Sequence, residues 1–240
     1  MKTFKLLDLF CGAGGAGEGY RRAGFDVVGV DVNPQPRYTA GRFVQADALA
    51  YVAQYGWMFD AIHASPPCQA HSRITPDKSK HVDLIPQTRF WLETIGAPYV
   101  IENVYGARRT LRNPVMLCGR DFGLKVYRHR LFESNVLLMG LHHEPHRDNT
   151  PRAGHGISDK GFISVTSGGK SSRRSNGLQS LSSEGFVTVT GHFSGIEYCR
   201  TAMGIEWMTA KELSQAIPPA FTEFLGRQIM THLQNKAVAA

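Results

Sequence analysis

The N-terminal half of the chain alternates between short apolar runs and helix-like segments. Five runs with the character of buried strands begin near Phe4, Asp26, Arg42, Phe59 and Pro98. Residues 14–24 and 83–96 read as helices, the first entered through a glycine turn. This alternation predicts an α/β fold with a doubly wound, mostly parallel sheet and right-handed crossovers. Few other architectures accommodate such a pattern.

Acidic residues and a cysteine follow the ends of these strands. Asp31, Asp47 and Glu102 each stand at a strand end. Cys68 follows the fourth strand, directly behind two prolines. In open α/β sheets, ligands bind beyond the carboxyl ends of the strands. We therefore expect these side chains to line one cleft.

A glycine-rich stretch separates the first strand from the first helix. Gly12, Gly14 and Gly17 form a G-x-G-x-x-G pattern, and Asp31 ends the next strand. The pattern is typical of nucleotide binding by nicotinamide or flavin enzymes, with a ligand-free glycine turn as the alternative. Asp47 shifts the interpretation toward S-adenosylmethionine. A carboxylate there can accept a hydrogen bond from an adenine amino group, and this cofactor has no pyrophosphate to place at a helix N-terminus.

Charge and cysteine content narrow the class of partner. The formal net charge is +7 and the pI is about 9.4, which favours an anionic partner such as nucleic acid. The cysteines form no CxxC pair, and no cysteine is near the histidine-rich HHEPH at 142–146, so we expect no bound metal. No signal peptide or membrane-spanning run is present, so we expect a cytoplasmic protein that does not enter a membrane.

Four motifs occur in a fixed order: DLFCGAGG from Asp8, SPPCQ from Ser65, IENV from Ile101 and YRHRLFE from Tyr127. Together they closely resemble the cytosine-C5 DNA methyltransferases, and ELSQAIPPAFTEFLG near the C-terminus resembles the closing motif of that family. The resemblance covers roughly residues 1–135 and 200–240. It implies a Rossmann-like methyltransferase fold and methyl transfer from S-adenosylmethionine to C5 of cytosine in double-stranded DNA, with S-adenosylhomocysteine as product.

The resemblance implies roles for the matching residues. Cys68 would be the nucleophile, Glu102 would contact the N3 and N4 edge of cytosine, and Arg130 would contact its O2. Arg128 would support the catalytic loop or bind phosphate, and in an extended segment it would share a face with Arg130. Phe10 would stack on adenine, with Asp31 on the ribose and Asp47 on the adenine amino group. The implied cofactor site comprises Phe10, Gly12, Gly14, Asp31, Asp47, Pro66 and Gln215.

The chemistry of this family sets requirements on protonation. Addition of a thiolate to C6 makes C5 able to attack a methyl group. Glu102 must be protonated to donate to N3, which implies a raised pKa in a dry pocket. Cys68 must be partly ionised, and we expect positive charge from Arg130 and from the DNA-binding groove to lower its pKa. The target base must leave the helix, and Gln69 and Ser72 are placed to meet the backbone or the vacated stack.

The character of the sequence changes after Met139. Two β-like runs, FISVT and FVTVT, flank a Gly- and Ser-rich stretch that carries Lys170, Arg173 and Arg174. We predict a catalytic and cofactor-binding domain at 1–139, a small β-containing recognition lobe at 140–195, and a helical segment at 196–240 that returns to the catalytic domain. The lobe would be built on a hairpin, with its basic loop following phosphates.

One position departs from the family pattern. Ser214-Gln215 stands where the closing motif usually has Gly-Asn, at the border of the cofactor pocket. Three other interpretations stay open: C5 methylation of cytosine in RNA, a catalytically silent DNA-binding relative, and a nicotinamide-dependent oxidoreductase. The intact Cys68 and Glu102 argue against the silent relative, and SPPCQ has no role in the oxidoreductase. We expect a monomer associated with the nucleoid, with a partner chain left open.

Overall fold

The computed structural model describes residues 3–72, 75–143, 162–164, 186–189 and 195–239. Its strands are β1 Lys5–Leu9, β2 Asp26–Asp31, β3 Arg42–Gln45, β4 Ala61–Ala64, β5 Tyr99–Val104, β6 Val115–Leu117, β7 Arg130–Ser134, β8 Phe162–Ser164 and β9 Phe186–Thr188. Its α-helices are α1 Gly15–Arg22, α2 Ala48–Tyr55, α3 Ile85–Ile95, α4 Ile196–Met203, α5 Ala210–Gln215 and α6 Pro219–Ala239. Short 3-10 helices are η1 Gly56–Met58, η2 Lys78–Lys80, η3 Tyr105–Arg109 and η4 Gly119–Phe122.

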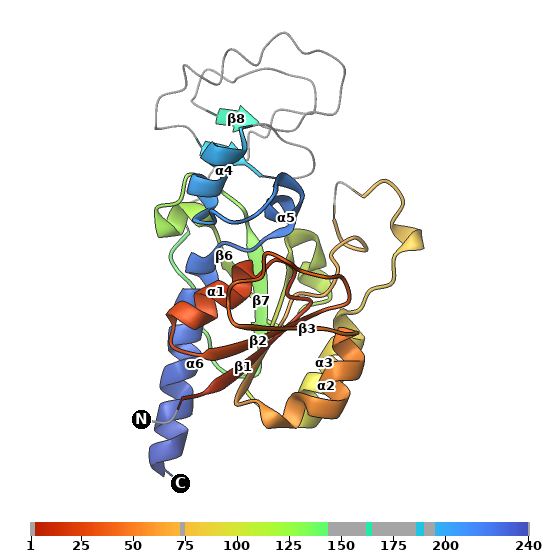
Figure 1. Cartoon of the computed structure of the whole chain (residues 1–240), viewed down its shortest axis with the longest axis vertical. Helices are drawn as coiled ribbons and strands as arrows, with labels where there is room; N and C mark the ends of the chain where they lie inside the picture. The colour runs from red at the N-terminus through yellow and green to blue at the C-terminus, as the bar shows by residue number, and fades with distance from the viewer. Residues whose placement is uncertain (1–2, 73–74, 144–161, 165–185, 190–194, 240) are drawn as a thin grey trace.

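Seven strands form one sheet in the order β3-β2-β1-β4-β5-β7-β6 (Figure 1). The pairs from β3 to β5 are parallel, whereas β7 runs antiparallel to both β5 and β6. The predicted doubly wound, mostly parallel sheet is therefore confirmed. The strand order reverses between β1 and β4, which is the position at which sheets of this type bind ligands.

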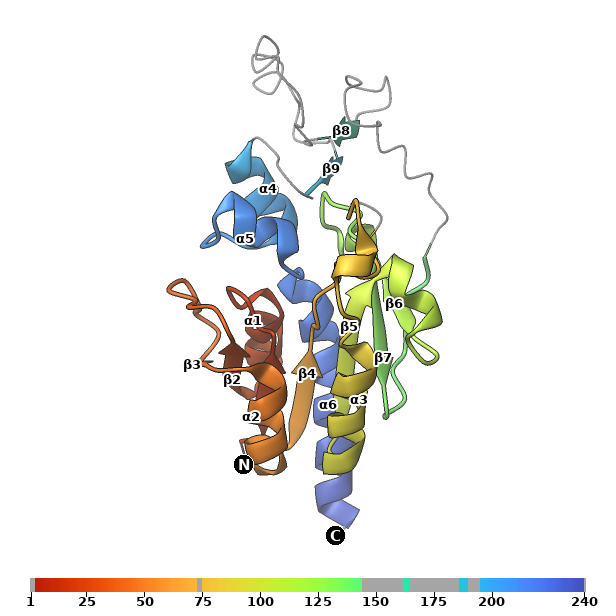
Figure 2. The same cartoon turned by 90° about the vertical axis from the view of Figure 1, so that its right-hand side faces the viewer.

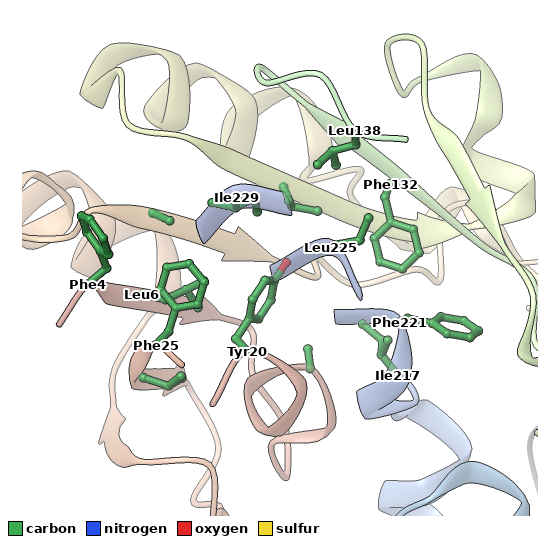
Figure 3. Packing of buried hydrophobic residues seen from close by; sticks show 14 of the residues in the cluster. Phe4, Leu6, Tyr20, Phe25, Phe132, Leu138, Ile217, Phe221, Leu225 and Ile229 are labelled. Atoms are coloured by element: carbon green, nitrogen blue, oxygen red, sulfur yellow. The ribbon is translucent and has the colours of Figure 1, made fainter. Parts of the chain in front are cut away.

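Each face of the sheet is covered by its own pair of helices. Leu6 of β1 belongs to a buried cluster with Tyr20 of α1 and Leu225 of α6. Leu7, the next residue of β1, belongs to a second cluster that includes residues of α2 and α3. The alternation of side chains along a strand explains this division. Figure 3 shows the first cluster, in which the last helix of the chain lies beside the first.

The two helices of the first cluster pack very closely. Thr222 Oγ1 donates a hydrogen bond to the Ala16 carbonyl at 2.8 Å. A Cβ at Gly19 would overlap Thr222 Oγ1 and the carbonyl of Pro219. Glycine at this position therefore permits the approach of α6. Helix α6 begins at Pro219, the second residue of the pair Pro218-Pro219. Proline suits the first turn of a helix, because the N–H that it lacks would be unpaired there.

The prediction of a hairpin in the recognition lobe is wrong. β8 and β9 pair in parallel, with Phe162 opposite Phe186 and Ser164 opposite Thr188. A two-residue turn can join only antiparallel strands, whereas parallel strands need a connection of about a dozen residues or more. Residues 165–185 supply that length, but the similarity of the two runs gave no sign of their direction.

The helices α4 and α5 lie beyond the end of the sheet toward which β4 points (Figure 2). Trp207, between them, donates a hydrogen bond from Nε1 to the Ala13 carbonyl at 2.8 Å. Arg37 forms an ion pair with Glu212 of α5 at 2.8 Å. Both contacts attach this segment to loops that follow β1 and β2. Within the described ranges, no helix combines the length and the apolarity needed to cross a bilayer.

We expect Gly19→Ala to destabilise the fold strongly. The added methyl group cannot be accommodated without moving α6 away from α1, and overpacking of this kind costs about 1–3 kcal/mol or more. Urea denaturation of the full chain measures the change. Gly140→Ala is the matched control, because a Cβ there lies 3.8 Å from its nearest neighbour, the Cβ of Val115. Equal stability of the two variants would contradict the close packing of α1 and α6.

Candidate active site at the carboxyl ends of the strands

The glycine loop after β1 is held against the end of β2. Phe10 and Gly12 have positive φ angles of 58° and 49°, so the backbone reverses sharply before α1. The Gly12 N–H donates to Asp31 Oδ2 at 3.0 Å, and Asp31 Oδ1 accepts from the Asn33 N–H at 2.9 Å. The Asp31 carboxylate is therefore fixed beside the loop. Its remaining lone pairs can accept hydrogen bonds from hydroxyl groups.

Asp47 has a local structural role. Its Oδ1 accepts a hydrogen bond from the Ala50 N–H at 2.8 Å and caps the N-terminus of α2. The Ala46 N–H donates to the Asp31 carbonyl at 3.0 Å, so the end of β3 lies beside the end of β2. Phe10 is half-buried against the second cluster. The structure therefore gathers three of the predicted cofactor residues at neighbouring strand ends.

The proline loop after β4 is tied down at several points. The Ser65 N–H donates to the Leu9 carbonyl at 3.1 Å. Asn103 Nδ2 donates to the carbonyl of Pro66, which is buried, at 2.9 Å. The Cys68 carbonyl accepts hydrogen bonds from the N–H groups of two residues in the following turn, His71 at 2.9 Å and Ser72 at 2.8 Å. This geometry holds Cys68 half-buried in a rigid loop.

Glu102 and Arg130 form a nearly buried ion pair. The Arg130 Nε lies 2.9 Å from Glu102 Oε1, on neighbouring antiparallel strands. Glu102 is 6% exposed. Burial raises the pKa of Glu102, although Arg130 and Arg128 act in the opposite direction. The expected direction of this pKa shift is confirmed.

The pKa of Cys68 does not follow the expectation. Burial raises the pKa of the Cys68 thiol, and the nearby Glu102 charge adds to this effect. Arg130 and, more weakly, Arg128 lower it without reversing the direction. The prediction of a lowered pKa is therefore wrong for the protein alone, because partial burial outweighs the two guanidinium groups. These interactions also show that Cys68, Glu102 and both arginines occupy one site.

Arg128 differs from the extended conformation expected of YRHRLFE. Its φ is +31°, and β7 begins only at Arg130. The buried guanidinium donates to the Val189 carbonyl at 2.6 Å and to the Ser214 carbonyl at 2.9 Å. Arg128 therefore joins β7 to the segments after β9 and within α5. Support of the loop, rather than phosphate contact, is the role that this geometry favours.

A chain of hydrogen bonds leads to Glu102 from α1. The Tyr20 hydroxyl lies 3.0 Å from His63 Nδ1, and His63 Nε2 lies 2.9 Å from Ser65 Oγ. Ser65 in turn hydrogen-bonds to Glu102. Burial lowers the pKa of His63 to about 3, so the ring is neutral. In one consistent assignment, the Tyr20 hydroxyl donates to His63 Nδ1, the His63 Nε2–H donates to Ser65 Oγ, and the Ser65 hydroxyl donates to Glu102.

This series of hydrogen bonds was not predicted from the sequence, and neither was a group of three potential metal ligands. A histidine inside an otherwise apolar strand was the available signal for His63. Cys118, His129 and His143 lie together, with their ligand atoms within 4.8 Å of one another. The expectation that no cysteine lies near the histidine-rich segment is therefore wrong, because Cys118 is close to His143 in space although distant in sequence.

The remaining predicted site residues are less constrained. Gln69 is half-buried, and its Oε1 has no hydrogen-bond partner among the described residues. Gln215 is exposed at the end of α5, next to Ala216, which lies against Gly15 at the start of α1. Lys170, Arg173 and Arg174 lie outside the described residues.

Comparison with known proteins gives a fold and a distant relative. No known family profile matches the chain. The type II methyltransferase M.AgeI of Thalassovita gelatinovora is 28% identical over 120 residues, which cover 42% of this chain and 28% of that protein. The chain therefore covers little more than a quarter of that relative.

Three solved structures align along nearly the whole chain. A putative DNA modification methyltransferase encoded within a prophage of Escherichia coli has a TM-score of 0.61, 16% identity, and coverage of 97% of this chain and 100% of its own. Dnmt2 of Schizosaccharomyces pombe has a TM-score of 0.61, 14% identity, and coverage of 97% and 99%. The methyltransferase EhMeth of Entamoeba histolytica has a TM-score of 0.54, 16% identity, and coverage of 99% of both chains. The chain thus has the Rossmann-like fold of S-adenosylmethionine-dependent methyltransferases.

We expect the buried His63 to make folding stability depend on pH. The unfolded chain, with an ordinary histidine pKa near ~6.5, binds a proton that folded His63 does not bind until about pH 3. His63 by itself therefore lowers the unfolding free energy as the pH decreases, by about 1.4 kcal/mol per pH unit between pH ~6 and ~4. Asp8 acts in the opposite direction in this window, because burial raises its pKa to about 8. Urea titrations should therefore give His63→Gln a pH slope that is smaller than that of the wild type by about 1.4 kcal/mol per pH unit. The exposed control His232→Gln should keep the wild-type slope, and an unchanged slope in His63→Gln would refute the assignment.

We expect Arg130→Gln to make the Cys68 thiol less reactive. Arg130 is the strongest influence that lowers the pKa of this thiol, and its loss leaves Glu102 unneutralised. Alkylation of Cys68 by iodoacetamide at pH ~8 should slow by about three- to fourfold for each unit of pKa increase, because the smaller thiolate fraction is partly offset by higher nucleophilicity. Arg108→Gln, an exposed position on η3, is the matched control. Mass spectrometry identifies the labelled cysteine. Equal alkylation rates in the two variants would contradict the electrostatic coupling.

Proposed function

We propose that this protein is an S-adenosylmethionine-dependent DNA methyltransferase that modifies C5 of cytosine. The observation that carries the proposal is the shared site of Cys68, Glu102 and Arg130 at the carboxyl ends of the strands. A thiol, a carboxyl group with a raised pKa and a guanidinium are the groups that nucleophilic attack on a cytosine ring requires. The distant relative M.AgeI is a type II methyltransferase, which supports the reaction class.

The residues around the glycine loop fit the proposed cofactor. Asp31 retains acceptor capacity beside the loop, where ribose hydroxyls would bind. Phe10 is half-buried and would stack on adenine, with Asp47 near the amino group. When bound, S-adenosylmethionine supplies an electrophilic methyl group. Gly12, Gly14, Pro66 and Gln215 complete the proposed cofactor site.

The side chains around the target cytosine would each have a separate role in the reaction. The Cys68 thiol loses its proton, and the thiolate sulfur forms a bond to C6 of cytosine. Glu102 donates a hydrogen bond or proton to N3, which accepts the electron density pushed into the ring. Arg130 stabilises negative charge near O2. After C5 has been methylated, H5 leaves to a base, the S–C6 bond breaks and Cys68 is released as thiolate.

The hydrogen-bonded series of Tyr20, His63 and Ser65 would position Glu102. A donor at Ser65 fixes one carboxyl oxygen, and the neutral ring of His63 fixes the Ser65 hydroxyl. Arg130 Nε lies 2.9 Å from Oε1 of the same carboxyl group. Glu102 thus has two partners, which favours a single orientation of the carboxyl group. We assign Tyr20, His63 and Ser65 as positioning residues.

The DNA contacts are proposed from the sequence. The target cytosine would turn out of the helix so that Cys68 can reach the face of the ring. Gln69 and Ser72 follow the nucleophile and would meet the backbone or the vacated stack. The lobe at 140–195 would contact double-stranded DNA, with Lys170, Arg173 and Arg174 on phosphates. Affinity would then fall with increasing salt concentration.

RNA is the alternative substrate. Dnmt2 of Schizosaccharomyces pombe and the prophage DNA modification methyltransferase have the same TM-score of 0.61 to this chain. Likeness of fold therefore favours neither of these two proteins as a guide to the substrate. The net charge of +7 suits either polymer. We favour DNA because the motifs resemble the DNA-modifying family and M.AgeI is a type II methyltransferase.

We expect Cys68→Ala to abolish methyl transfer. The assay measures transfer of labelled methyl from S-adenosylmethionine to duplex DNA, single-stranded DNA and tRNA. Loss of the nucleophile should reduce kcat by at least about a thousandfold, with little change in cofactor affinity. The wild-type protein should also form a covalent complex with DNA containing 5-fluorocytosine, because fluorine at C5 cannot leave as a cation.

Cys199→Ala is the control for this experiment, since it removes a buried thiol from α4 outside the site. It should methylate DNA at the wild-type rate. Label on tRNA but not on either DNA would change the substrate assignment. Equal labelling by Cys68→Ala would overturn the covalent mechanism.

A further inference from the structure

Three potential metal ligands meet at the start of β7. Leu117 and Arg130 pair across β6 and β7, so Cys118 and His129 are the next opposing positions of this antiparallel ladder. The Gly119 N–H donates to the Tyr127 carbonyl at 2.8 Å, so the two segments stay side by side beyond the ladder, shifted by one residue from its register. His143 comes from the chain after β7. Their ligand atoms all lie within 4.8 Å of one another. Backbone pairing thus brings Cys118 and His129 together.

The spacing of the two imidazoles fits a tetrahedral metal ion. His129 Nε2 and His143 Nε2 lie 3.3 Å apart. Two nitrogens bound to zinc at about 2.0–2.1 Å in tetrahedral geometry are separated by about 3.3–3.4 Å. Cys118 is fully buried, whereas both histidines are half-buried. Thiolate and imidazole are ligands that Zn²⁺ takes in proteins, and they do not suit the hard cations Mg²⁺ and Ca²⁺.

A carboxylate supports one of these ligands from behind. The two oxygens of Asp121, in η4, lie 3.2 and 3.1 Å from His143 Nδ1. Donation of the Nδ1 proton to this carboxylate leaves the Nε2 lone pair directed toward His129. Carboxylate–histidine pairs of this kind orient metal ligands and make them more basic. Without a metal ion, the two imidazoles hydrogen-bond to each other at this distance.

We propose that Cys118, His129 and His143 bind a structural zinc ion. Tetrahedral zinc takes four ligands, so these three residues leave one position for another ligand. His129 lies between Arg128 and Arg130, so the ion fixes the backbone that carries both arginines. Zinc binding stands independently of the proposed function, whereas its effect on methyl transfer depends on that function.

Metal content of the full-length protein tests the site directly. We expect one zinc per chain by mass spectrometry of the purified, dialysed protein, and less than about a tenth of that in Cys118→Ser and His143→Ala. His142→Ala is the matched control, because His142 is the exposed neighbour of His143 and outside the cluster. It should retain zinc. Equal loss of zinc in His142→Ala and His143→Ala would overturn the ligand assignment.

Cobalt replacement tests the donor set without depending on any variant that misfolds. Co²⁺ added to the metal-free wild-type chain should give a thiolate-to-cobalt charge-transfer band and visible d–d bands of tetrahedral coordination. Cys118→Ser should lose the charge-transfer band. Zinc at a hundredfold excess over its Kd should raise the Tm of the wild-type chain by about 5–10 °C and leave that of His143→Ala unchanged.

Two outcomes separate this inference from the proposed function. A wild-type chain without zinc, without cobalt bands and without a zinc-dependent Tm overturns the metal site, whatever its methyltransferase activity. A chain that binds zinc but transfers no methyl group to DNA or RNA leaves the metal site intact and overturns the proposed function. Binding of Mg²⁺ in place of zinc would also contradict the donor set.

Discussion

The central parallel strands must be covered on both faces, and the N-terminal half of the chain does not supply enough helices to do so. The helices α2 and α3 cover one face, but α1 is short and leaves part of the other open. The helix α6 fills this space, packing Phe221, Leu225 and Ile229 into the cluster of α1. Parallel strands are stable only when buried in this way. The last described helix therefore belongs to the same hydrophobic core as the N-terminal strands.

The same face of the sheet contains the polar groups of the candidate site. His63 and Glu102 alternate with apolar residues that face α2 and α3, so both side chains face α1 and α6. Burial of polar groups is costly unless each finds a partner. Tyr20 and Ser65 provide partners for His63, and Arg130 provides one for Glu102. Helix α1 therefore contributes both to the core and to the orientation of the proposed acid.

The beginning of β7 is the point where the distant segments meet. Arg128 donates hydrogen bonds to the backbone of Val189 and Ser214, and so links β7 to the segments that follow β9 and form α5. His129 turns to the cluster with Cys118, and Arg130 turns to Glu102. Three consecutive residues thus make contacts in three different directions. The positive φ of Arg128 allows this, because a regular strand would direct alternate side chains to only two faces.

Local sequence pattern was enough to predict the strands from β1 to β5, the glycine loop and the acidic residues at the strand ends, because apolar periodicity and turn residues act within a few positions. The cofactor-side residues and the Cys68 loop followed from motifs of the same local kind. Four features depended on tertiary structure. They are the direction of β9, the conformation of Arg128, the series of hydrogen bonds from Tyr20 to Glu102, and the cluster of Cys118, His129 and His143. Each of these joins residues that are distant in sequence, through strand register, helix packing or burial. No short stretch of the chain contains that information.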